Sequence, residues 1–347
     1  MTVLAQTWRA HTQRVLPGTL VCATIALAAT YLSEHYGGPQ LLYALLIGLA
    51  FHFLSHSPSV MPGVAFCGRT VLRLGVALLG ARITMTQIAA LGWTTAVLVM
   101  VAVGSTVLFG LAMAKWLKRP ADEGLLSGGA VAICGASAAL AVASVLPQTK
   151  ANERFTLLMV VGVTVLSTLA MVVYPFVLKL AGVSDVLAGV FLGGTIHDVA
   201  QVVAAGTMLG PAAGDVATVV KLFRVMLLMP VAILISLAYR HHAQGRSGVH
   251  FDVNSELPTE RGRVPLVPNF LLAFVVLVLL ASVGVIGKEL AQVASSGSRW
   301  MLVIAIAAAG IKTSFEDLMK LGWQPVLMIV AETLFIAAMV LIGMNFV

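Results

Sequence analysis

Two ionisable side chains, His197 and Asp198, lie next to each other inside the apolar stretch 185–208. An ionisable residue at that depth in a membrane segment is costly and marks a functional site by default. Histidine changes charge near neutral pH, and Gln201 shares the helical face of Asp198 because it follows three residues later. We interpret these three residues as a coupling group, one that binds and releases a proton. Sodium is the alternative ion, and a His–Asp pair that only stabilises packing is the alternative role.

Two basic side chains, Lys221 and Arg224, lie deep in the next apolar stretch, 214–239. They are three residues apart and therefore project from one face of a helix. Arginine offers an oxyanion a bidentate fork, and lysine offers a point charge. The pair predicts a substrate-binding site for an anion. The alternatives are snorkelling toward the membrane surface and neutralisation of Asp198 or Asp215.

Small residues dominate 127–144, with Gly135 at their centre. Such a run either lets helices pack closely or marks a helix that is interrupted in mid-membrane. An interrupted helix offers an anion free N–H groups and the positive end of a helix dipole. We therefore add Gly135, Ala136 and Ser137 to the predicted substrate-binding residues.

A glycine pair, Gly193–Gly194, precedes the His–Asp pair and suggests a second interruption. The glycines can unwind the helix there, and Thr195 can cap the half that follows. The N–H groups of Gly194 and Thr195 would then complete the anion site. Glu332 is the remaining deep acid, and its role is left open between pairing with a basic residue and a second proton site.

These residues belong to a chain whose composition suits a lipid environment. Of its 347 residues, 59% are hydrophobic and 10% are charged, with a net charge of +7 from scattered basic residues. Roughly 25% charged residues are usual in soluble domains, so a soluble enzyme, a disulfide scaffold, a disordered chain and a nucleic-acid-binding protein are excluded. A spanning helix needs about 20 apolar residues. We predict an all-α polytopic membrane protein of about eleven transmembrane helices. They are placed at 17–34, 39–55, 62–82, 94–116, 124–147, 154–181, 185–208, 214–239, 266–286, 298–312 and 322–346.

The domain organisation is that of a single membrane domain. Residues 1–16 form a cytoplasmic N-terminus, 17–239 hold helices 1–8, and 266–347 hold helices 9–11. The stretch 240–265 is rich in Pro, Gly, Ser and mixed charge, which is typical of a solvated loop, here cytoplasmic.

The distribution of Lys and Arg predicts the orientation, because these residues favour the cytoplasmic side. With the N-terminus inside, most of them fall on cytoplasmic connections, Lys179 among them, and few fall outside, including Lys150 and Arg154. This favours a periplasmic C-terminus. If the fifth or tenth segment re-enters the membrane instead of crossing it, the C-terminus changes side.

An internal repeat links the two halves of the chain. The frame Gly-x-(Arg/Lys)-x-(Thr/Ser) followed by Leu-Gly-Trp begins at Gly80 and again at Gly310, 230 residues later, without a gap. The copies are separated by seven predicted helices and would be inverted in the membrane. Inverted repeats with interrupted core helices are the architecture of many secondary transporters.

Sequence motifs for other chemistry are lacking. The chain has no phosphate loop, zinc-protease motif, nucleophile elbow or dinucleotide fingerprint. Cys22, Cys67 and Cys134 lie in apolar stretches without metal-ligand spacing, and we expect them to be small buried side chains. We expect no enzyme activity, no cofactor, no metal and no nucleic-acid partner.

The combination of segments resembles the YeiH-like sulfate exporter family of bacterial inner-membrane proteins. The resemblance spans the chain from about residue 39 onward and is carried by Gly75–Trp93, Cys134–Ala138, Gly193–Gly206, Lys221–Met226 and Gly310–Trp323. It implies a carrier related to the bile-acid-symporter and sodium/proton-antiporter group of folds. Those folds combine a scaffold panel with a core of two crossing, interrupted helices.

We therefore expect a secondary-active transporter of the bacterial inner membrane that exports a small anion such as sulfate by proton-coupled alternating access. Its expected partners are the anion, the coupling proton or sodium ion, and the lipid bilayer, with a homodimer left open. Alternative substrates are a sulfonate or an organic acid, and a sodium/proton-coupled exchanger is a further alternative. Of another class, a channel or a non-transporting membrane sensor is the alternative.

Overall fold

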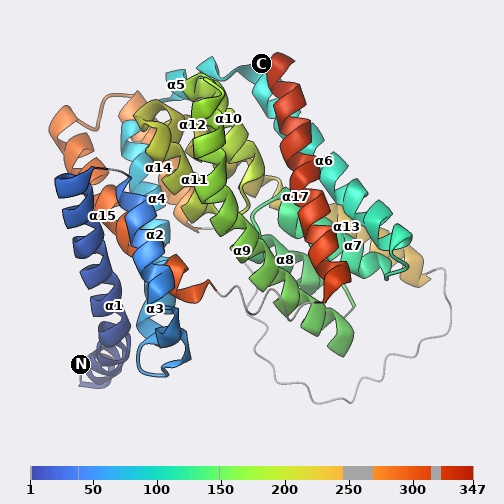
Figure 1. The fold of residues 1–347 in the computed structure, drawn as a ribbon, viewed down its shortest axis with the longest axis horizontal. Helices are drawn as coiled ribbons and strands as arrows, with labels where there is room; N and C mark the ends of the chain where they lie inside the picture. Colours follow the sequence, from blue (N-terminus) through green and yellow to red (C-terminus); the bar gives the residue numbers. More distant parts are fainter. Residues whose placement is uncertain (1, 38, 148, 245–268, 314–321, 347) are drawn as a thin grey trace.

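The chain is helical throughout the part that the structure describes (Figure 1). The computed structural model describes residues 2–37, 39–147, 149–244, 269–313 and 322–346. Seven helices in these ranges are long and apolar enough to cross a membrane. The predicted all-α polytopic class is confirmed. The predicted loop 240–265, from residue 245 onward, and residues 314–321 of the second repeat copy lie outside the described residues.

The helices of the first half follow the predicted apolar stretches. They are α1 (Thr2–Tyr36), α2 (Gln40–Ala50), η1 (His52–His56), α3 (Met61–Phe66), η2 (Cys67–Val71), α4 (Leu72–Leu79), η3 (Gly80–Arg82), α5 (Met85–Ala90), α6 (Gly92–Trp116), α7 (Ala121–Ala132), α8 (Ala136–Val145) and α9 (Lys150–Leu180). A π-helical turn, η2, joins α3 and α4 into one membrane span.

The second half continues in the same way. Its helices are α10 (Asp185–Thr195), α11 (Val199–Leu209), α12 (Pro211–Met226), α13 (Leu228–Gln244), α14 (Asn269–Ser282), α15 (Lys288–Lys312), α17 (Trp323–Gly343) and η4 (Met344–Phe346). The short arms α7, α8, α10 and α11 are the elements that form the site described below.

The predicted fifth span is a hairpin that re-enters the membrane. After α7 ends at Ala132, Gly135 adopts a φ of +63°, and α8 starts at Ala136. Nδ2 of Asn152, at the start of α9, donates to Oδ2 of Asp122, at the start of α7, at 3.2 Å. If α7 and α8 were collinear, those ends would be roughly 35 Å apart. Therefore α8 returns to the end of the molecule from which α7 came.

The predicted seventh span is a second hairpin. The residues 196–198 turn the chain between α10 and α11. A Cβ built on Gly210, directly after α11, would lie 3.7 Å from Oδ2 of Asp185, at the start of α10. Each arm has 11 residues, and such an arm reaches about halfway across a 30 Å hydrocarbon core. The structure thus has two re-entrant hairpins in place of two crossing, interrupted helices.

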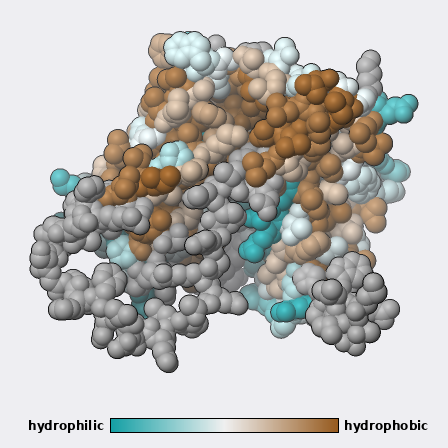
Figure 2. Space-filling view, turned by 180° about the vertical axis from the view of Figure 1, so that it is seen from behind, coloured by the Kyte–Doolittle hydropathy of each residue, from teal (hydrophilic) through white to brown (hydrophobic). Residues whose placement is uncertain are grey.

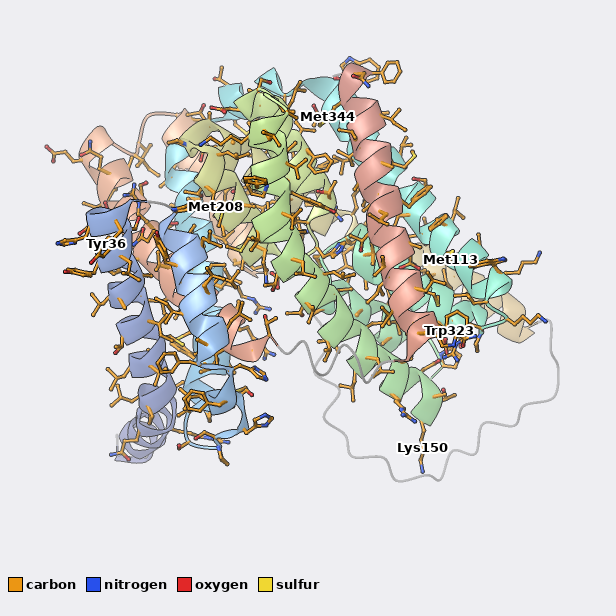
Figure 3. All side chains as sticks on the ribbon, in the orientation of Figure 1. Tyr36, Met113, Lys150, Met208, Trp323 and Met344 are labelled. Atoms are coloured by element: carbon orange, nitrogen blue, oxygen red, sulfur yellow. The ribbon has the colours of Figure 1, made fainter. Side chains whose placement is uncertain are left out.

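The hairpins enter from opposite ends of the molecule. Lys150, after the first hairpin, lies at the lower end in Figure 3, and Met208, at the end of the second, lies at the upper end. Lys150 and Arg154 therefore share the end that holds the N-terminus, and Lys179 lies at the other, which exchanges the predicted sides of these three residues. The N-terminal end thereby gains two basic residues and loses one, so the excess of Lys and Arg at that end becomes larger. The termini lie at opposite ends (Figure 1), and the assignment of either end to the cytoplasm stays a prediction.

Cysteine labelling tests the hairpin assignment. Single cysteines at Lys115, Lys150 and Lys179, all exposed, are introduced after the three native cysteines are replaced. We expect an impermeant maleimide to reach Lys115→Cys and Lys150→Cys from the same side of oriented vesicles and Lys179→Cys from the other side. Labelling of Lys115→Cys and Lys150→Cys from opposite sides would show that the fifth segment crosses the membrane.

Reciprocal contacts show that the sequence repeat is a structural repeat. A Cβ on Gly80 would lie 2.5 Å from the carbonyl oxygen of Phe274 in α14, and a Cβ on Gly310 would lie 2.5 Å from that of Leu45 in α2. Each copy of the motif thus packs against the helix that opens the other copy. The predicted repeat and its pairing of helices 2–4 with 9–11 are confirmed.

The paired units run in opposite directions. Met113, near the end of α6, lies closer to Trp323, at the start of α17, than to Met344, at its upper end (Figure 3). The glycines that precede or open these helices, Gly92 and Gly322, have φ values of +73° and +81°. In the chain, the first hairpin and α9 come after the repeat motif that begins at Gly80. The second hairpin and α12 come before the repeat motif that begins at Gly310. The two units therefore contain the same parts in permuted order.

The glycine contacts give a stability prediction. Gly80→Ala and Gly310→Ala are each expected to lower stability by about 1–3 kcal/mol, because the added methyl group overlaps a backbone carbonyl that cannot move freely. Gly104→Ala is the control, since a Cβ there meets nothing within 4 Å. Thermal unfolding in detergent measures the three variants. Equal midpoints for Gly310→Ala and Gly104→Ala would contradict the close contact.

The helices form two groups (Figure 1). The scaffold group comprises α1–α4, α14 and α15, and the core group comprises both hairpins with α6, α9, α12 and α17. Large apolar side chains such as Leu27, Leu108 and Phe176 remain exposed, and apolar surface covers much of the upper part of the face in Figure 2. A soluble monomer does not expose apolar patches of this extent, so these faces suit a bilayer.

Candidate functional site

The tips of the two hairpins meet at Lys221 of α12. The first tip comprises residues 133–135 and the second 196–198. Nζ of Lys221 donates to the carbonyl oxygens of Ile133 at 2.5 Å and Ile196 at 2.9 Å. Lys221 is fully buried. One ammonium group therefore joins both tips.

Arg224, one turn further along α12, binds backbone carbonyls at the ends of α7 and α10. Its Nε donates to the carbonyl of Ala132, and its Nη2 donates to those of Val131 and Ala132, at 2.7–3.0 Å. Its Nη1 donates to the carbonyls of Gly193 and Ile196 at 3.0 and 3.1 Å. These contacts engage all five N–H donors of the guanidinium group. Arg224 is fully buried and has no donor left for another partner.

The two cations thus serve the backbone of the hairpins. The carbonyls at the ends of α7 and α10 have no intrahelical partners, and a bilayer offers no water to replace them. Lys221 and Arg224 satisfy these groups and neutralise the negative ends of two helix dipoles. A direct contact between Arg224 and the substrate does not fit this geometry, because all of its donors are consumed. Nζ of Lys221 has three donors and uses two of them on these carbonyls, so its predicted contact with the substrate stays a prediction. Snorkelling does not describe their contacts, because both side chains are fully buried and donate to backbone carbonyls. Asp198 interacts with Lys221 through its charge.

At the second tip, the residue that caps the following helix is not the predicted one. Gly194 and Thr195 belong to α10, and Oγ1 of Thr195 donates to the carbonyl of Phe191 at 2.7 Å. They stand at a carbonyl end and so present no N–H groups to an anion, which corrects the prediction. The cap of α11 is Asp198, whose Oδ1 accepts from the N–H of Ala200 at 3.2 Å.

The glycine pair of the second hairpin has a packing role. Gly193 and Gly194 stay helical, and the chain breaks at 196–198 instead. A Cβ on Gly193 would lie 2.5 Å from the carbonyl of Ala217 in α12, and one on Gly194 would lie 3.1 Å from Val340 in α17. The missing side chains therefore let α10 approach both helices closely. By contrast, the predicted interruption at Gly135 is confirmed.

His197 connects the second tip to two other core helices. Its Nδ1 lies 3.1 Å from the carbonyl oxygen of Val131 in α7, and its Nε2 lies 3.0 Å from Oγ1 of Thr333 in α17. Because a carbonyl oxygen only accepts, Nδ1 carries a proton. The side chain is fully buried. His197 therefore fixes the position of the tip relative to α7 and α17.

The free N-terminal end of α8 points to an anion site. This end has no side-chain cap, Ser137 is exposed and Ala136 is partly exposed. At the tips, Lys221 and Arg224 outnumber Asp198, which leaves excess positive charge, and the dipole of α8 adds to it. The N–H of Gly135 donates to the carbonyl of Ala130 at 2.8 Å, so an oxyanion would bind the N–H groups of Ala136 and Ser137 and balance that charge.

Gln201 supplies a second sign of a missing ligand. Its side chain is fully buried, and neither its amide oxygen nor its amide nitrogen has a hydrogen-bond partner among the described residues. Buried polar groups in proteins are nearly always satisfied, so each such exception needs an explanation. Gln201 lies in the first turn of α11, directly after the Asp198 cap. A bound molecule with polar atoms can satisfy it.

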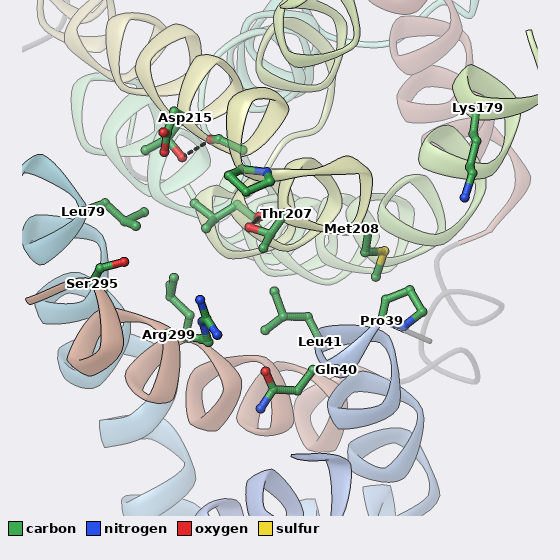
Figure 4. Close-up of a pocket in the computed structure, with 15 residues that line it drawn as sticks. Pro39, Gln40, Leu41, Leu79, Lys179, Thr207, Met208, Asp215, Ser295 and Arg299 are labelled. Atoms are coloured by element: carbon green, nitrogen blue, oxygen red, sulfur yellow. Dashed lines mark hydrogen bonds between the residues drawn. The ribbon is translucent and has the colours of Figure 1, made fainter. Parts of the chain in front are cut away.

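A cavity of about 470 Å³ separates the scaffold group from the core group at the end of the molecule that holds Met208 (Figure 4). Arg299 of α15 and Lys179 of α9 line it, and Val203 and Thr218 form part of its core-side wall. Thr218 lies three residues before Lys221 on α12, or about 4.5 Å along the helix axis. The cavity therefore extends toward the hairpin tips.

Several groups at the site were not predicted from the sequence. They are the carbonyls of 131–133, 193 and 196, the hydroxyl of Thr333, and the hydroxyl of Ser167, which accepts the N–H of Asp198 at 2.9 Å. Backbone groups carry no sequence signal until the chain reversals are known. Ser167 and Thr333 are polar residues in apolar helices, which is a weak signal that many packing hydroxyls share.

The fold and the site define a polytopic α-helical membrane protein built from inverted repeats, with two re-entrant hairpins that meet inside the core. The sequence pattern of the family described as Conserved hypothetical protein 698 matches residues 17–329. The chain belongs to this family.

Relatives from several bacteria match nearly the whole chain. UPF0324 membrane protein CT0845 of Chlorobaculum tepidum is 49% identical over 94% of this chain and 88% of its own length. UPF0324 membrane protein TauZ of Paracoccus denitrificans is 48% identical over 96% of both chains. A UPF0324 membrane protein of Bacillus cereus is 32% identical over 88% of this chain and 87% of its own. These names agree with a multi-pass membrane protein.

Proposed function

We propose that the protein is a secondary carrier for a small oxyanion, sulfate or a sulfonate, with proton-coupled export by alternating access. The observation that carries the proposal is the charge balance at the hairpin tips. Lys221 and Arg224 are bound to carbonyl ends, Asp198 supplies one negative charge, and the N-terminal end of α8 stays uncapped. A monovalent or divalent oxyanion at Ser137 fits this arrangement.

The two helix groups suggest how access alternates. The cavity between them lies at the end that holds Met208 and is lined by residues of α11 and α12 as far as Thr218, one turn before Lys221. A movement of the core group against the scaffold group would close this cavity and expose the tips from the other end. Inverted repeats suit two such states, because a pseudo-two-fold axis relates the repeats and the two repeats can exchange their conformations between the states. Lys221 and Arg224 would keep the tips joined during the movement.

Counterflow in proteoliposomes tests the proposal. Labelled sulfate is supplied outside and excess unlabelled sulfate inside, and the expected result is a transient accumulation of label that later decays. Methanesulfonate inside should also drive accumulation, whereas gluconate inside should not. Protein-free vesicles are the control. Flux without transient accumulation would indicate a channel, and sulfate binding without flux would indicate a sensor; either result would overturn the carrier proposal.

The coupling ion is tested in the same vesicles. We expect sulfate uptake against its gradient when a pH gradient is imposed, with the same rate in sodium and in choline media. Uptake that requires sodium and ignores the pH gradient would replace the proton by sodium in the proposal.

A further inference from the structure

Glu332 is a buried acid in the middle of α17. Its side chain is fully buried, and Oε1 lies 2.7 Å from Oγ of Ser127 in α7, within hydrogen-bond distance. Its Oε2 is also inaccessible and has no hydrogen-bond partner among the described residues. A Cβ on Gly110 of α6 would lie 3.0 Å from Oε1. The carboxyl group is thus enclosed by three packed helices at the depth of the hydrocarbon core.

The surroundings of Glu332 contain no ion-pair partner in the described part of the chain. The salt bridge in these ranges joins Arg119 to Glu123 at the start of α7. The other charged side chains that the structure describes on elements packed against α17 lie near helix ends, at Lys115, Asp122, Lys150, Arg154, Lys179 and Asp185. His197 is also titratable, and its Nε2 contacts the hydroxyl of Thr333, the residue that follows Glu332.

The hydrogen bonds fit a carboxylic acid better than a carboxylate. A protonated Oε1 can donate to Oγ of Ser127, whose own hydrogen then goes to the carbonyl of Gly124, 3.4 Å away. Only a neutral carbonyl oxygen, Oε2, is then left unsatisfied. In the ionised form Ser127 must turn its one hydrogen to Glu332, and Oε2 would be a charged oxygen without a donor, which is far more costly in an apolar site.

We propose that Glu332 is the proton-binding residue of the coupling mechanism, an inference that rests on the proposed carrier function. Binding forms the O–H bond on the carboxyl group and completes the chain from Glu332 through Ser127 to Gly124. Release to water breaks that O–H bond and returns the hydroxyl of Ser127 to the carboxylate. Release to water requires α6, α7 and α17 to separate locally, because these three core-group helices enclose the carboxyl group.

The position of Glu332 connects the proton to the hairpin tips. Thr333, the next residue, contacts Nε2 of His197, and Ser127 lies one turn before Val131, whose carbonyl accepts from both His197 and Arg224. A change in charge at Glu332 therefore alters the contact between α7 and α17 directly beside the second tip. His197 acts in this scheme as a positioning residue.

Infrared spectroscopy tests proton binding without any need for transport. At neutral pH the wild-type protein should show the carbonyl band of a protonated carboxylic acid, shifted in D₂O, and Glu332→Gln should lack it. The band should decline reversibly as the pH is raised. A band that persists in Glu332→Gln, or one in the wild type that never titrates while the protein stays folded, would overturn the proposal. Glu289→Gln, an exposed acid in α15, is the matched control.

Transport separates this proposal from the carrier function. Glu332→Gln copies the protonated state, so it should keep at least about half of the wild-type sulfate counterflow and lose uptake driven by a pH gradient. Retained pH-driven uptake in Glu332→Gln would refute the role of Glu332 and leave the carrier function intact. If wild-type vesicles show no counterflow while the infrared band titrates as expected, the carrier function fails and the proton site stands.

Discussion

Arg224→Met is expected to cause the largest loss of stability of any substitution at the hairpin tips. The change removes five hydrogen bonds to carbonyls of Val131, Ala132, Gly193 and Ile196. Removal of one partner from a buried charged network costs about 3–5 kcal/mol. We expect a large fall in the thermal midpoint in detergent, or a loss of monodisperse protein. Arg224→Lys should be intermediate, because an ammonium group has only three donors.

Arg299→Met is the control for this experiment. Arg299 is also an arginine of a membrane helix, but it is exposed and lines the cavity, so its loss should leave the midpoint unchanged. The experiment separates two roles for Arg224. A well-folded Arg224→Met protein with an unchanged midpoint and no sulfate binding would restore the direct substrate contact predicted from the sequence.

Ser137→Asp is expected to abolish sulfate counterflow while the protein stays folded. The new carboxylate would occupy the uncapped end of α8, where helix dipoles favour a negative charge, and it would repel an incoming oxyanion. Two like charges about 4 Å apart repel by roughly 4 kcal/mol in a partly polar site, so the loss should be at least about 100-fold. Ser137 is exposed, and the fold should tolerate the change.

Ser137→Ala and Ser137→Asn are the matched variants. Both keep the backbone N–H groups that we expect to hold the anion, and they should change counterflow by no more than about tenfold, because one neutral hydrogen bond contributes about 1 kcal/mol. Counterflow in Ser137→Asp at the level of Ser137→Ala would show that the anion binds elsewhere.

The sequence carried enough signal to predict the class of fold and the place of the first chain reversal. Long apolar segments predict membrane helices by a simple length requirement, and Gly135 marks a backbone position with a positive φ that other residues rarely adopt. The repeat at Gly80 and Gly310 was visible because the same close contact recurs in both units.

The direction of the chain after each reversal could not be predicted in the same way. An interrupted spanning helix and a re-entrant hairpin have the same composition, and the difference depends on contacts such as Asp122 with Asn152. The error carried over to the side assigned to Lys150 and Lys179. With hairpins, more Lys and Arg residues fall at the N-terminal end of the molecule than with crossing helices. This difference can be used only when hairpins are among the arrangements compared.

The partners of the deep charges were the other feature beyond prediction. Spacing placed Lys221 and Arg224 on one helical face, which is correct, and their chemistry suits oxyanions and backbone carbonyls alike. The free carbonyls of α7 and α10 exist only because both helices end in mid-membrane. Which donor meets which acceptor was therefore decided by the packing of α12 between the tips.

Substrate protection of a cysteine at position 137 tests the central claim most directly. In a protein without its native cysteines, the alkylation rate of Ser137→Cys by a water-soluble maleimide is measured with sulfate and with gluconate at equal ionic strength. The account predicts that sulfate slows the reaction, with half-protection at the concentration that half-saturates counterflow. Equal rates in both anions, or a cysteine that never reacts, would contradict an anion site at the end of α8.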